Sequence, residues 1–439
     1  MIAQITPKPL AGIVPAISSK SMAHRLIIAA ALANGHTQIA CSTTCADIDA
    51  TVRCLTALGA HIDRTPEGYE VSPIPKSREM GILAALKGGT LDCGESGSTL
   101  RFMLPVACAL GADATFTGAE RLGERPLGDL ASELLAGGCD LTGLDSFPLK
   151  TTGRLRPGRF VLPGDVSSQY ISGLLLAAPV LPGRVEILVR GRIESKPYVN
   201  LTIQALHTFG VDVETKRLVG TTPEEPQTLF IVEGEGYRTP GAVSVEGDWS
   251  NAAFWLCAGA LSRYAVTVRG ISLNSVQGDR TIMAALVRFG AKVTRGTDAA
   301  TVRPDRLHGF ELSARDIPDL VPIVSAVAAC AEGKTVIRDC ARLRIKESDR
   351  LLTTTETLQA LGADIRIEGD SLVIEGRETL DGGTIEAHND HRIAMTAAIA
   401  ASRCERPVTI VGAEAVAKSY PSFFEHYRLL GGNVTLKEA

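Results

Sequence analysis

The stretch HTFGVDV, residues 207–213, combines two signals that decide the fold. A helical segment ends at Gly210, and a strand-like residue, Val213, follows three positions later. Glycine readily takes the left-handed backbone that follows a helix end. The same arrangement occurs five more times, at intervals of 69 to 80 residues, in TALGAHI (56–62), LAGGCDL (135–141), VRFGAKV (287–293), QALGADI (359–365) and RLLGGNV (428–434). This spacing predicts six copies of one α/β unit.

A second repeat alternates with the first and predicts buried helices. Each unit has a stretch rich in alanine and other small residues, followed by a β-branched strand such as VEILV (185–189). The six stretches are residues 19–35, 97–111, 167–183, 248–262, 317–333 and 389–402. They are apolar nearly all round, so we expect them to lie inside the protein. Each unit of about 72 residues then contains two helices and strands that are covered by helices.

Six units divide most simply into two domains of three. The Gly-rich segment 233–247 lies near the midpoint and is the expected crossover. The sixth unit has only one strand-like run, NVTLK, so we expect residues 2–8 to supply its missing strand. The predicted domains are therefore 1–15 plus 240–439, which is discontinuous, and 16–239. Two connections, near 13–20 and 235–245, form a natural hinge.

Composition excludes several classes of protein. Apolar residues make up 45% and charged residues 21%, which is ordinary for a globular chain. The longest apolar runs are far short of the roughly 20 residues that span a membrane, and we expect a cytoplasmic monomer without a targeting segment. A net charge of −4 and the lack of a long basic run do not favour nucleic-acid binding. The ten cysteines show no C-x-x-C motif, which favours reduced thiols.

Polar residues stand at the starts of the buried helices. Five starts carry residues suited to capping or to anion contact: Ser19-Lys20-Ser21, Gly97-Ser98-Thr99, Ser167-Ser168-Gln169, Asp248-Trp249-Ser250-Asn251 and Asn389-Asp390-His391-Arg392. The fifth helix instead opens with Ile317-Pro318-Asp319. For any single helix, plain capping explains these residues. Cations also occur at several starts, where they oppose the helix dipole unless an anion binds between them.

Further basic residues cluster in connections, at Arg121 and Arg125, in RLRIKESDR (342–350) and at Lys418. Taken alone, such runs are usually solvated surface charge. Asp319 and Glu347 are candidate acid/base groups, although either also suits a cap or an ion pair. The pair His388 and His391 lacks the neighbours of a metal site, so we expect it to be structural.

Several motifs together resemble the EPSP synthase family, the 3-phosphoshikimate 1-carboxyvinyltransferases. They are SKSMAHR, GESGSTLRF, GERP, VSSQY, ESKPY, EGDWS, IPD, RIKESDR, NDHR and AKSYP, and they span Lys20 to Pro421 in order. The resemblance implies an α/β, two-domain enolpyruvyl-transferase-like fold of six βαβαββ repeats, three per domain. It also implies transfer of the enolpyruvyl group of phosphoenolpyruvate to the 5-hydroxyl of shikimate 3-phosphate, in the shikimate pathway. No organic cofactor or metal is expected.

The resemblance also assigns residues. The shikimate 3-phosphate shell would be Lys20, Ser21, Arg25, Ser167, Ser168, Gln169, Ser195, Tyr198, Asp319 and Lys346. The phosphoenolpyruvate shell would be Lys20, Gly97, Arg125, Gln169, Arg350, Arg392 and Lys418. Asp319 is similar to the family's base for the 5-hydroxyl, and Glu347 to the acid that protonates the methylene carbon. Lys20 would lie close to the reacting atoms.

The chain departs from the family pattern at two places. Glu95-Ser96 stands where Asn-Ala is common before the glycine, and Arg342 stands where an Asn is often found. Glyphosate binds this family's phosphoenolpyruvate pocket, so these changes leave inhibitor sensitivity open. We expect Gly97→Ala to weaken glyphosate binding and to raise the Michaelis constant for phosphoenolpyruvate.

Three other classes of protein share some of these features. The sister transferase acting on UDP-N-acetylglucosamine usually carries a Cys in the loop that corresponds to residues 119–128, and this chain has none there. A non-catalytic anion-binding protein would have lost Asp319, Glu347 or Lys20, and all three are present. An RNA-end-processing enzyme is disfavoured by the absence of a long basic stripe and of a catalytic His motif.

Overall fold

The computed structural model describes residues 1–75, 87–218 and 226–438, and it divides into two compact units. The continuous unit is Ser18–Val245, and the discontinuous unit is Met1–Ile17 with Glu246–Ala439. The chain therefore passes between the units at 17–18 and again at 245–246. The sequence-based boundaries were 15–16 and 239–240.

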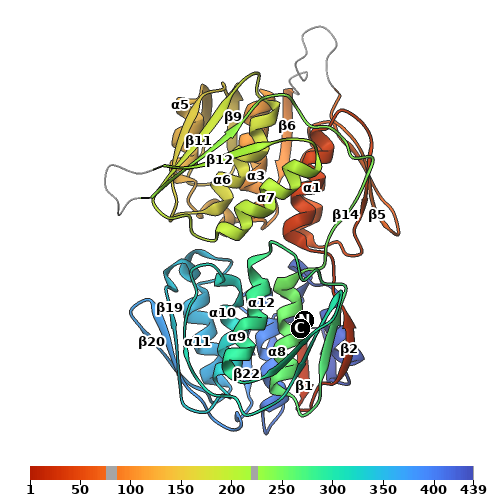
Figure 1. The fold of residues 1–439 in the computed structure, drawn as a ribbon, viewed down its shortest axis with the longest axis vertical. Coiled ribbons are helices and arrows are strands. Elements are labelled where there is room, and N and C mark those ends of the chain that lie inside the picture. Colours follow the sequence, from red (N-terminus) through yellow and green to blue (C-terminus); the bar gives the residue numbers. More distant parts are fainter. Residues whose placement is uncertain (76–86, 219–225, 439) are drawn as a thin grey trace. The chain divides into compact units, whose positions relative to one another are not determined.

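Within its described residues, the continuous unit contains three four-stranded sheets (Figure 1). Their strand orders are β14(Ala242–Ser244)-β3(Thr37–Ala40)-β5(Gly68–Ser72)-β4(His61–Arg64), β6(Lys87–Asp92)-β7(Asp113–Thr117)-β9(Leu149–Gly153)-β8(Cys139–Thr142) and β10(Arg159–Pro163)-β11(Val185–Arg190)-β13(Gln227–Val232)-β12(Val213–Leu218). The helices are α1(Lys20–Leu32), α2(Ala46–Ala57), α3(Gly97–Leu110), α4(Glu120–Gly123), α5(Gly128–Ala136), α6(Ser168–Ala177), η1(Ala178–Val180) and α7(Lys196–Thr208).

The discontinuous unit repeats this plan in its own described residues. Its sheets are β16(Lys292–Arg295)-β17(Ala299–Arg303)-β15(Val266–Arg269)-β2(Gly12–Pro15), β18(Glu311–Ser313)-β19(Lys334–Arg338)-β21(Ser371–Glu375)-β20(Asp364–Glu368) and β22(Thr384–Glu386)-β23(Val408–Val411)-β1(Ile2–Thr6)-β24(Asn433–Lys437). Its helices are α8(Trp249–Leu261), η2(Gly278–Thr281), α9(Ile282–Phe289), η3(Pro318–Leu320), α10(Val321–Ala328), η4(Ala341–Ile345), α11(Arg350–Ala360), α12(His391–Ala400), η5(Ala401–Arg403), η6(Ala413–Lys418) and α13(Phe423–Leu429).

Every sheet joins one parallel strand pair to two antiparallel pairs, which is the βαβαββ unit. In the second sheet, for example, β6 pairs parallel with β7 across α3, while β9 pairs antiparallel with β7 and β8. The six glycines of the opening repeat all have positive φ, from +70° at Gly210 to +104° at Gly290. They therefore take the left-handed conformation that the sequence predicted, and the six-repeat α/β fold is confirmed.

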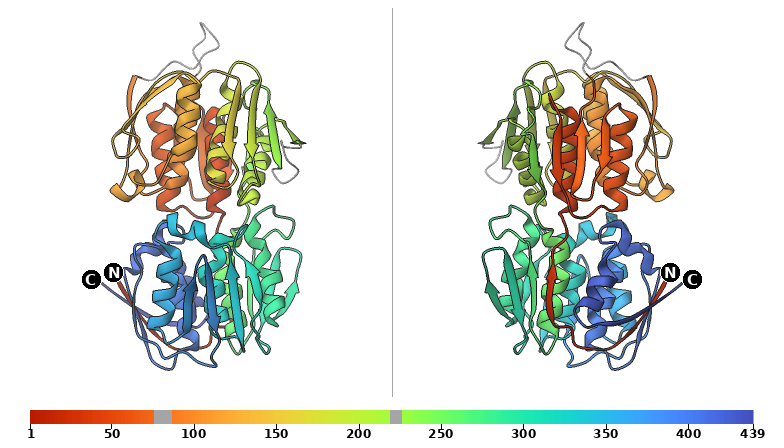
Figure 2. Two further views of the ribbon diagram at one scale, coloured as in Figure 1. Left: turned by 90° about the vertical axis from the view of Figure 1, so that its left-hand side faces the viewer. Right: turned by 90° about the vertical axis from the view of Figure 1, so that its right-hand side faces the viewer.

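The N-terminal strand completes the last sheet. β1 pairs antiparallel with both β23 and β24, with Ile5 opposite Val434 and Ile2 opposite Val411. Figure 2 shows this strand, in red, beside the blue C-terminal elements of the same unit. β2 and β14 each pair in parallel with a strand distant in sequence, β15 and β3 respectively.

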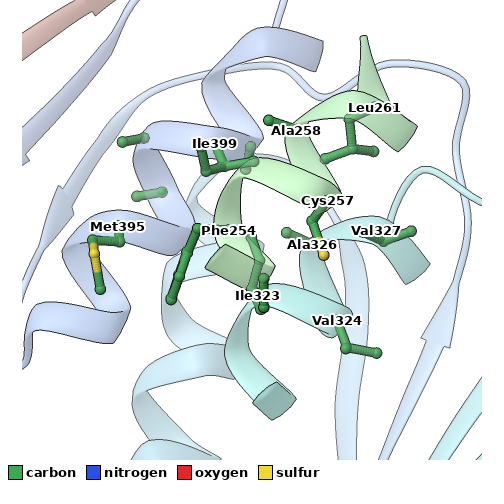
Figure 3. Packing of buried hydrophobic residues seen from close by; sticks show 14 of the residues in the cluster. Phe254, Cys257, Ala258, Leu261, Ile323, Val324, Ala326, Val327, Met395 and Ile399 are labelled. Atoms are coloured by element: carbon green, nitrogen blue, oxygen red, sulfur yellow. The ribbon is translucent and has the colours of Figure 1, made fainter. Parts of the chain in front are cut away.

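The small-residue helices form the core of each unit. All residues of α8, α10 and α12 are buried. Figure 3 shows Phe254 of α8 lying among side chains of α10 and α12, including Ile323 and Met395. Alanines such as Ala258 and Ala326, fully buried, let the three helices approach closely. This packing fixes the helix starts, where the charged residues lie.

Two helix starts show details that the sequence pattern did not specify. The cap of α3 is Ser96, one residue before the predicted start, and its hydroxyl accepts from the Thr99 N–H at 3.2 Å. The fifth helix opens with the 3-10 turn η3 rather than an α-turn. Pro322 has no N–H for the carbonyl of Pro318, so the Val321 N–H bonds to it instead.

Among the helices that the structure describes, none combines the length and the apolar content needed to cross a bilayer.

Candidate active site

The predicted site residues fall into two sets, one in each unit. The continuous unit holds Lys20, Ser21, Arg25, Gly97, Arg125, Ser167, Ser168, Gln169, Ser195 and Tyr198. The discontinuous unit holds Asp319, Lys346, Glu347, Arg350, Arg392 and Lys418.

In the continuous unit, serine hydroxyls cap three of the buried helices. Ser19 accepts from the N–H of Met22 in α1, and Ser167 accepts from the N–H of Gln169 in α6. Ser96 does the same for α3. These bonds satisfy part of each helix end. Plain capping therefore accounts for the three hydroxyls as acceptors, and any anion site rests on the neighbouring cations.

Arg25 is a buried cation whose partners are neutral. Its side chain is 2% exposed. Its guanidinium donates to the Thr202 hydroxyl at 2.8 Å, the Ser21 carbonyl at 2.6 Å and the Tyr198 carbonyl at 3.0 Å. Burial lowers the pKa of Arg25 to about 10, so it stays charged at neutral pH. In the part of the chain that the structure describes, no carboxylate forms an ion pair with Arg25.

A buried charge without a counter-ion is costly. Arg25 lies in the second turn of α1, and its guanidinium reaches back to the Ser21 carbonyl in the first turn. An anion bound there would offset the cost of burying this charge. The surroundings of Arg25 therefore fit a phosphate or carboxylate ligand.

Gly97 brings a second cation to the start of α3. A Cβ atom on Gly97 would lie 2.4 Å from Nη1 of Arg125 and 2.8 Å from Nη1 of Arg101. Both guanidiniums thus rest against this backbone. Nε of Arg125 is buried and has no hydrogen-bond partner among the described residues. The side chain of Gln169 joins the α6 start to α3 by donating to the Ser98 hydroxyl at 2.9 Å.

Lys20 and Ser195 show two further features of this unit. Nζ of Lys20 lies 2.8 Å from the carboxylate of Asp47 in α2. Nothing in the sequence, across 27 residues, indicated this pairing. Ser195 precedes α7 with φ of +52° and is 1% exposed, so the chain turns there in a conformation that few side chains adopt.

In the discontinuous unit, six charged residues form what we call the Asp319 cluster. Its members are Asp319, Lys346, Glu347, Arg350, Asp390 and Arg392. The sequence motifs named five of these as site residues. Asp390 was expected only as a helix-start residue.

Asp319 lies within reach of three cations. Its carboxylate is 2.8 Å from Nη1 of Arg350, 3.3 Å from Nζ of Lys346 and 3.3 Å from Nη2 of Arg392. Nη1 of Arg392 also donates to the Asp319 carbonyl at 3.1 Å. These residues come from η3, the η4–α11 connection, the start of α11 and the start of α12, so the repeat fold brings together three separate helix starts.

Arg350 is the centre of the cluster and is 1% exposed. Its guanidinium forms two bonds with Asp390, at 2.8 and 3.1 Å, and lies 2.6 Å from Glu347. Burial acts to lower the pKa of Arg350, but the carboxylates of Asp390, Glu347 and Asp319 outweigh it and raise that pKa. The guanidinium is therefore permanently charged and largely neutralised by acidic partners.

The carboxylate of Asp390 binds three groups at the start of α12. Besides binding Arg350, it accepts from the Arg392 N–H as the N-cap and from the Ser348 hydroxyl at 2.9 Å. Burial acts to raise the pKa of Asp390, but Arg350 outweighs this and lowers it. Lys418 lies nearby, since its Nζ donates to the carbonyl of Asn389 at 2.6 Å.

The structure also locates the two places where the chain departs from the family pattern. Glu95 is exposed on the connection before α3. Arg342 lies in η4 and contributes to the lowered pKa of Lys346. Burial is the largest cause of that lowering, Arg342 and Arg350 add to it, and Asp319 acts in the opposite direction. Among the described residues, no group of three or more His, Cys, Asp and Glu is arranged to hold a metal ion.

Comparison with known proteins identifies the class first. Over 99% of this chain and 100% of the other, an EPSP synthase from Acinetobacter baumannii superposes with a TM-score of 0.79 at 27% identity. The enolpyruvyl transferase NikO from Streptomyces tendae superposes with a TM-score of 0.76 at 20% identity, which shows the fold. The chain thus has the enolpyruvyl transferase fold.

The family follows from the sequence comparisons. Residues 5–427 match the model of EPSP synthase (3-phosphoshikimate 1-carboxyvinyltransferase). The 3-phosphoshikimate 1-carboxyvinyltransferase of Clostridium kluyveri is 39% identical over 98% of this chain and 97% of its own length. That of Clostridioides difficile is 38% identical over 98% of each. The chain belongs to the EPSP synthase family, and the predicted resemblance is confirmed.

Proposed function

We propose that the protein transfers the enolpyruvyl group of phosphoenolpyruvate to the 5-hydroxyl of shikimate 3-phosphate and releases inorganic phosphate. In the addition, the hydroxyl oxygen bonds to C2 of phosphoenolpyruvate, the hydroxyl loses its proton and the methylene carbon gains one. In the elimination, the C2–O bond to phosphate breaks and the new methyl group gives back a proton. The proton transfers need two positioned groups, and the substrates need several cations.

The observation that carries this proposal is the Asp319 cluster, with a carboxylate held 2.8 to 3.3 Å from three cations. Asp319 is the proposed base for the 5-hydroxyl. Three cations stabilise its negative charge and so weaken it as a base. When anionic substrates bind Lys346 and Arg392, they offset that stabilisation. The proton affinity of Asp319 then rises when the substrates are in place.

Glu347 is the proposed acid. Its carboxylate lies 2.6 Å from Nη2 of Arg350, an ion pair that favours the charged form of the carboxyl. A substrate carboxylate that takes this position on Arg350 releases Glu347 from its cation. The released carboxyl can then take up a proton and deliver it to the methylene carbon.

The proposed role of the site residues in the continuous unit is to bind anionic groups of the substrates. We propose that Arg25, with Ser21, Ser167, Ser168, Gln169, Ser195 and Tyr198, holds shikimate 3-phosphate. Lys20, Gly97, Arg125 and Gln169 contribute to phosphoenolpyruvate binding, together with Arg350, Arg392 and Lys418. The neutral partners of Arg25 and the unpartnered Nε of Arg125 support these roles.

The test is phosphate release by the purified protein. We expect release only when phosphoenolpyruvate and shikimate 3-phosphate are both present, and none when UDP-N-acetylglucosamine replaces shikimate 3-phosphate. Mass spectrometry should find the enolpyruvyl ether of shikimate 3-phosphate. Equal release with the sugar nucleotide, or release without any acceptor, would contradict the proposal.

A further inference from the structure

Asp279 is a buried carboxyl that the proposed reaction does not use. It lies in η2 and is 2% exposed. Oδ2 accepts a hydrogen bond from the hydroxyl of Ser250, at the start of α8. Oδ1 is buried and has no hydrogen-bond partner among the described residues. A carboxylate oxygen left without a donor is expensive to bury, whereas the protonated carboxyl is much less so.

The charged groups around Asp279 belong to the Asp319 cluster and to the cap of α8. Helix α8 packs against both η2 and η3, which carries Asp319. Asp319, Arg392 and Asp248 all act electrostatically on Asp279. Helix α9 also packs against η2, and its charged residue, Arg288, donates instead to the carbonyl of Glu311.

These effects together bring the ionisation of Asp279 close to neutral pH. Burial is the largest and raises the pKa of Asp279, and the negative charge of Asp319 raises it further. Arg392 and the Ser250 hydroxyl act in the opposite direction, and the result is a pKa of about 7. Asp319, which is paired with three cations, takes the negative charge instead.

We propose that Asp279 is a positioning residue for the Asp319 cluster, protonated in the active form so that it does not compete with Asp319 for Arg392. The proposal rests on the proposed function, because Arg392 is there a ligand of phosphoenolpyruvate. When Asp279 ionises, a second carboxylate competes for Arg392 and repels the incoming anion. The enzyme therefore loses affinity for phosphoenolpyruvate as the pH rises through the ionisation of this one carboxyl.

The test compares pH profiles of the Michaelis constant for phosphoenolpyruvate. Wild type and Asp279→Asn are measured from about pH 6 to about pH 9, which brackets the carboxyl's pKa of about 7. The amide mimics the neutral carboxyl, so at about pH 6 the Michaelis constants of wild type and variant should agree within about threefold. As the pH increases, the Michaelis constant of wild type should rise, and that of the variant should not. Parallel profiles would overturn the proposal.

Glu246→Gln is the matched control. Glu246 is a neighbouring carboxyl whose pKa is also raised, chiefly by burial, but it accepts from Ser275 and lies outside the Asp319 cluster. In this variant the Michaelis constant for phosphoenolpyruvate should still rise with pH, as it does in wild type.

If Asp279→Asn does not fold, Ser250→Ala serves instead. Loss of the hydroxyl that stabilises the ionised form should move the midpoint of the rise to higher pH, and an unmoved midpoint would also overturn the proposal.

Infrared spectroscopy separates this inference from the proposed function. A protonated carboxyl has its own C=O stretch, which should be present below the pKa of Asp279, fade above it and be missing from Asp279→Asn. Its absence from wild type would overturn the inference even if the enzyme turns over. Conversely, a wild-type protein that shows the band but releases no phosphate would contradict the proposed function alone.

Discussion

Substitution of Gly97 by alanine tests the geometry of the α3 start. The added Cβ would lie 2.4 Å from Nη1 and 2.9 Å from Cζ of Arg125, and 2.8 Å from Nη1 of Arg101. Contacts this short cannot persist, so atoms must move. The obstructing atoms are the ends of flexible side chains, and Gly97 is the first residue of a helix, where alanine is favourable. The fold should therefore survive, and the guanidinium of Arg125 should be displaced.

The size of the effect follows from that displacement. Restoring an ordinary contact distance moves the guanidinium of Arg125 by about 1 Å, which is enough to break a hydrogen bond. A hydrogen bond to a charged group contributes about 1.5–3 kcal/mol, which is a factor of roughly 10 to 150 in affinity. We therefore expect the Michaelis constant for phosphoenolpyruvate to rise by at least about tenfold. The inhibition constant of glyphosate should rise as well.

Steady-state phosphate release at saturating shikimate 3-phosphate measures both constants. Gly89→Ala in β6 is the control, because its Cβ would meet the Ala57 carbonyl at an ordinary 3.5 Å. This control should leave both constants unchanged. A Gly97→Ala protein with a wild-type melting temperature and wild-type constants would refute the reasoning, since Arg125 would then have no part in binding the substrate.

The other predictions concern single charges and the absence of a metal. Arg25→Met should weaken shikimate 3-phosphate binding in calorimetry by about 10- to 100-fold, whereas Arg184→Met, which removes an exposed ion pair, should not; equal effects would contradict the assignment. Asp390→Asn should lower the free energy of unfolding by about 1.5–3 kcal/mol, since Arg350 loses its fully buried carboxylate partner but keeps Asp319 and Glu347. The pKa of Asp390 is depressed in the folded protein, so its contribution to the free energy of unfolding is complete above its unfolded pKa of about 3.9. That contribution is lost as the pH falls through the folded pKa. In denaturant titrations below pH ~4, the free energies of unfolding of wild type and variant should therefore converge. Asp319→Ala should still bind ligand but release phosphate at least about 100-fold more slowly, and near-normal turnover would exclude it as the base. A chelator should leave turnover unchanged, and loss of activity that added metal restores would show that a metal takes part.

The repeat architecture was predictable because it depends on local physics. The left-handed turn at Gly210 and its five counterparts follows from the backbone freedom of glycine, which is visible in the sequence. The burial of α8 follows from a segment that is apolar all round. Neither inference needs a long-range contact.

Details of the helix starts were harder to predict, because neighbouring residues compete for each role. Ser96, Ser98 and Thr99 could all cap α3, and only the backbone path selects Ser96. Asp319 lies in a 3-10 turn because Pro322, three residues further along, cannot donate to the carbonyl of Pro318. The sequence contains both prolines, but their effect on the turn depends on bonding geometry.

The long-range ion-pair partners of the site cations could not be predicted. Lys20 pairs with Asp47 across 27 residues, and Arg350 pairs with Asp390 across 40. The family motifs name the cations because substrates require them, but the carboxylates that balance the cations in the absence of substrate follow only from the fold. Asp279 was missed for the same reason.

These partners give the two units different electrostatic characters. Arg25 in the continuous unit is held by neutral oxygens, so an anion can bind there without displacing a carboxylate or changing a protonation state. Arg350 in the discontinuous unit is already neutralised by Asp390, Glu347 and Asp319, so an anion can bind there only if a carboxylate yields or takes up a proton. The first arrangement suits a group that is bound and left unchanged, such as the phosphate of shikimate 3-phosphate. The second couples binding to proton movement, which an addition followed by an elimination requires.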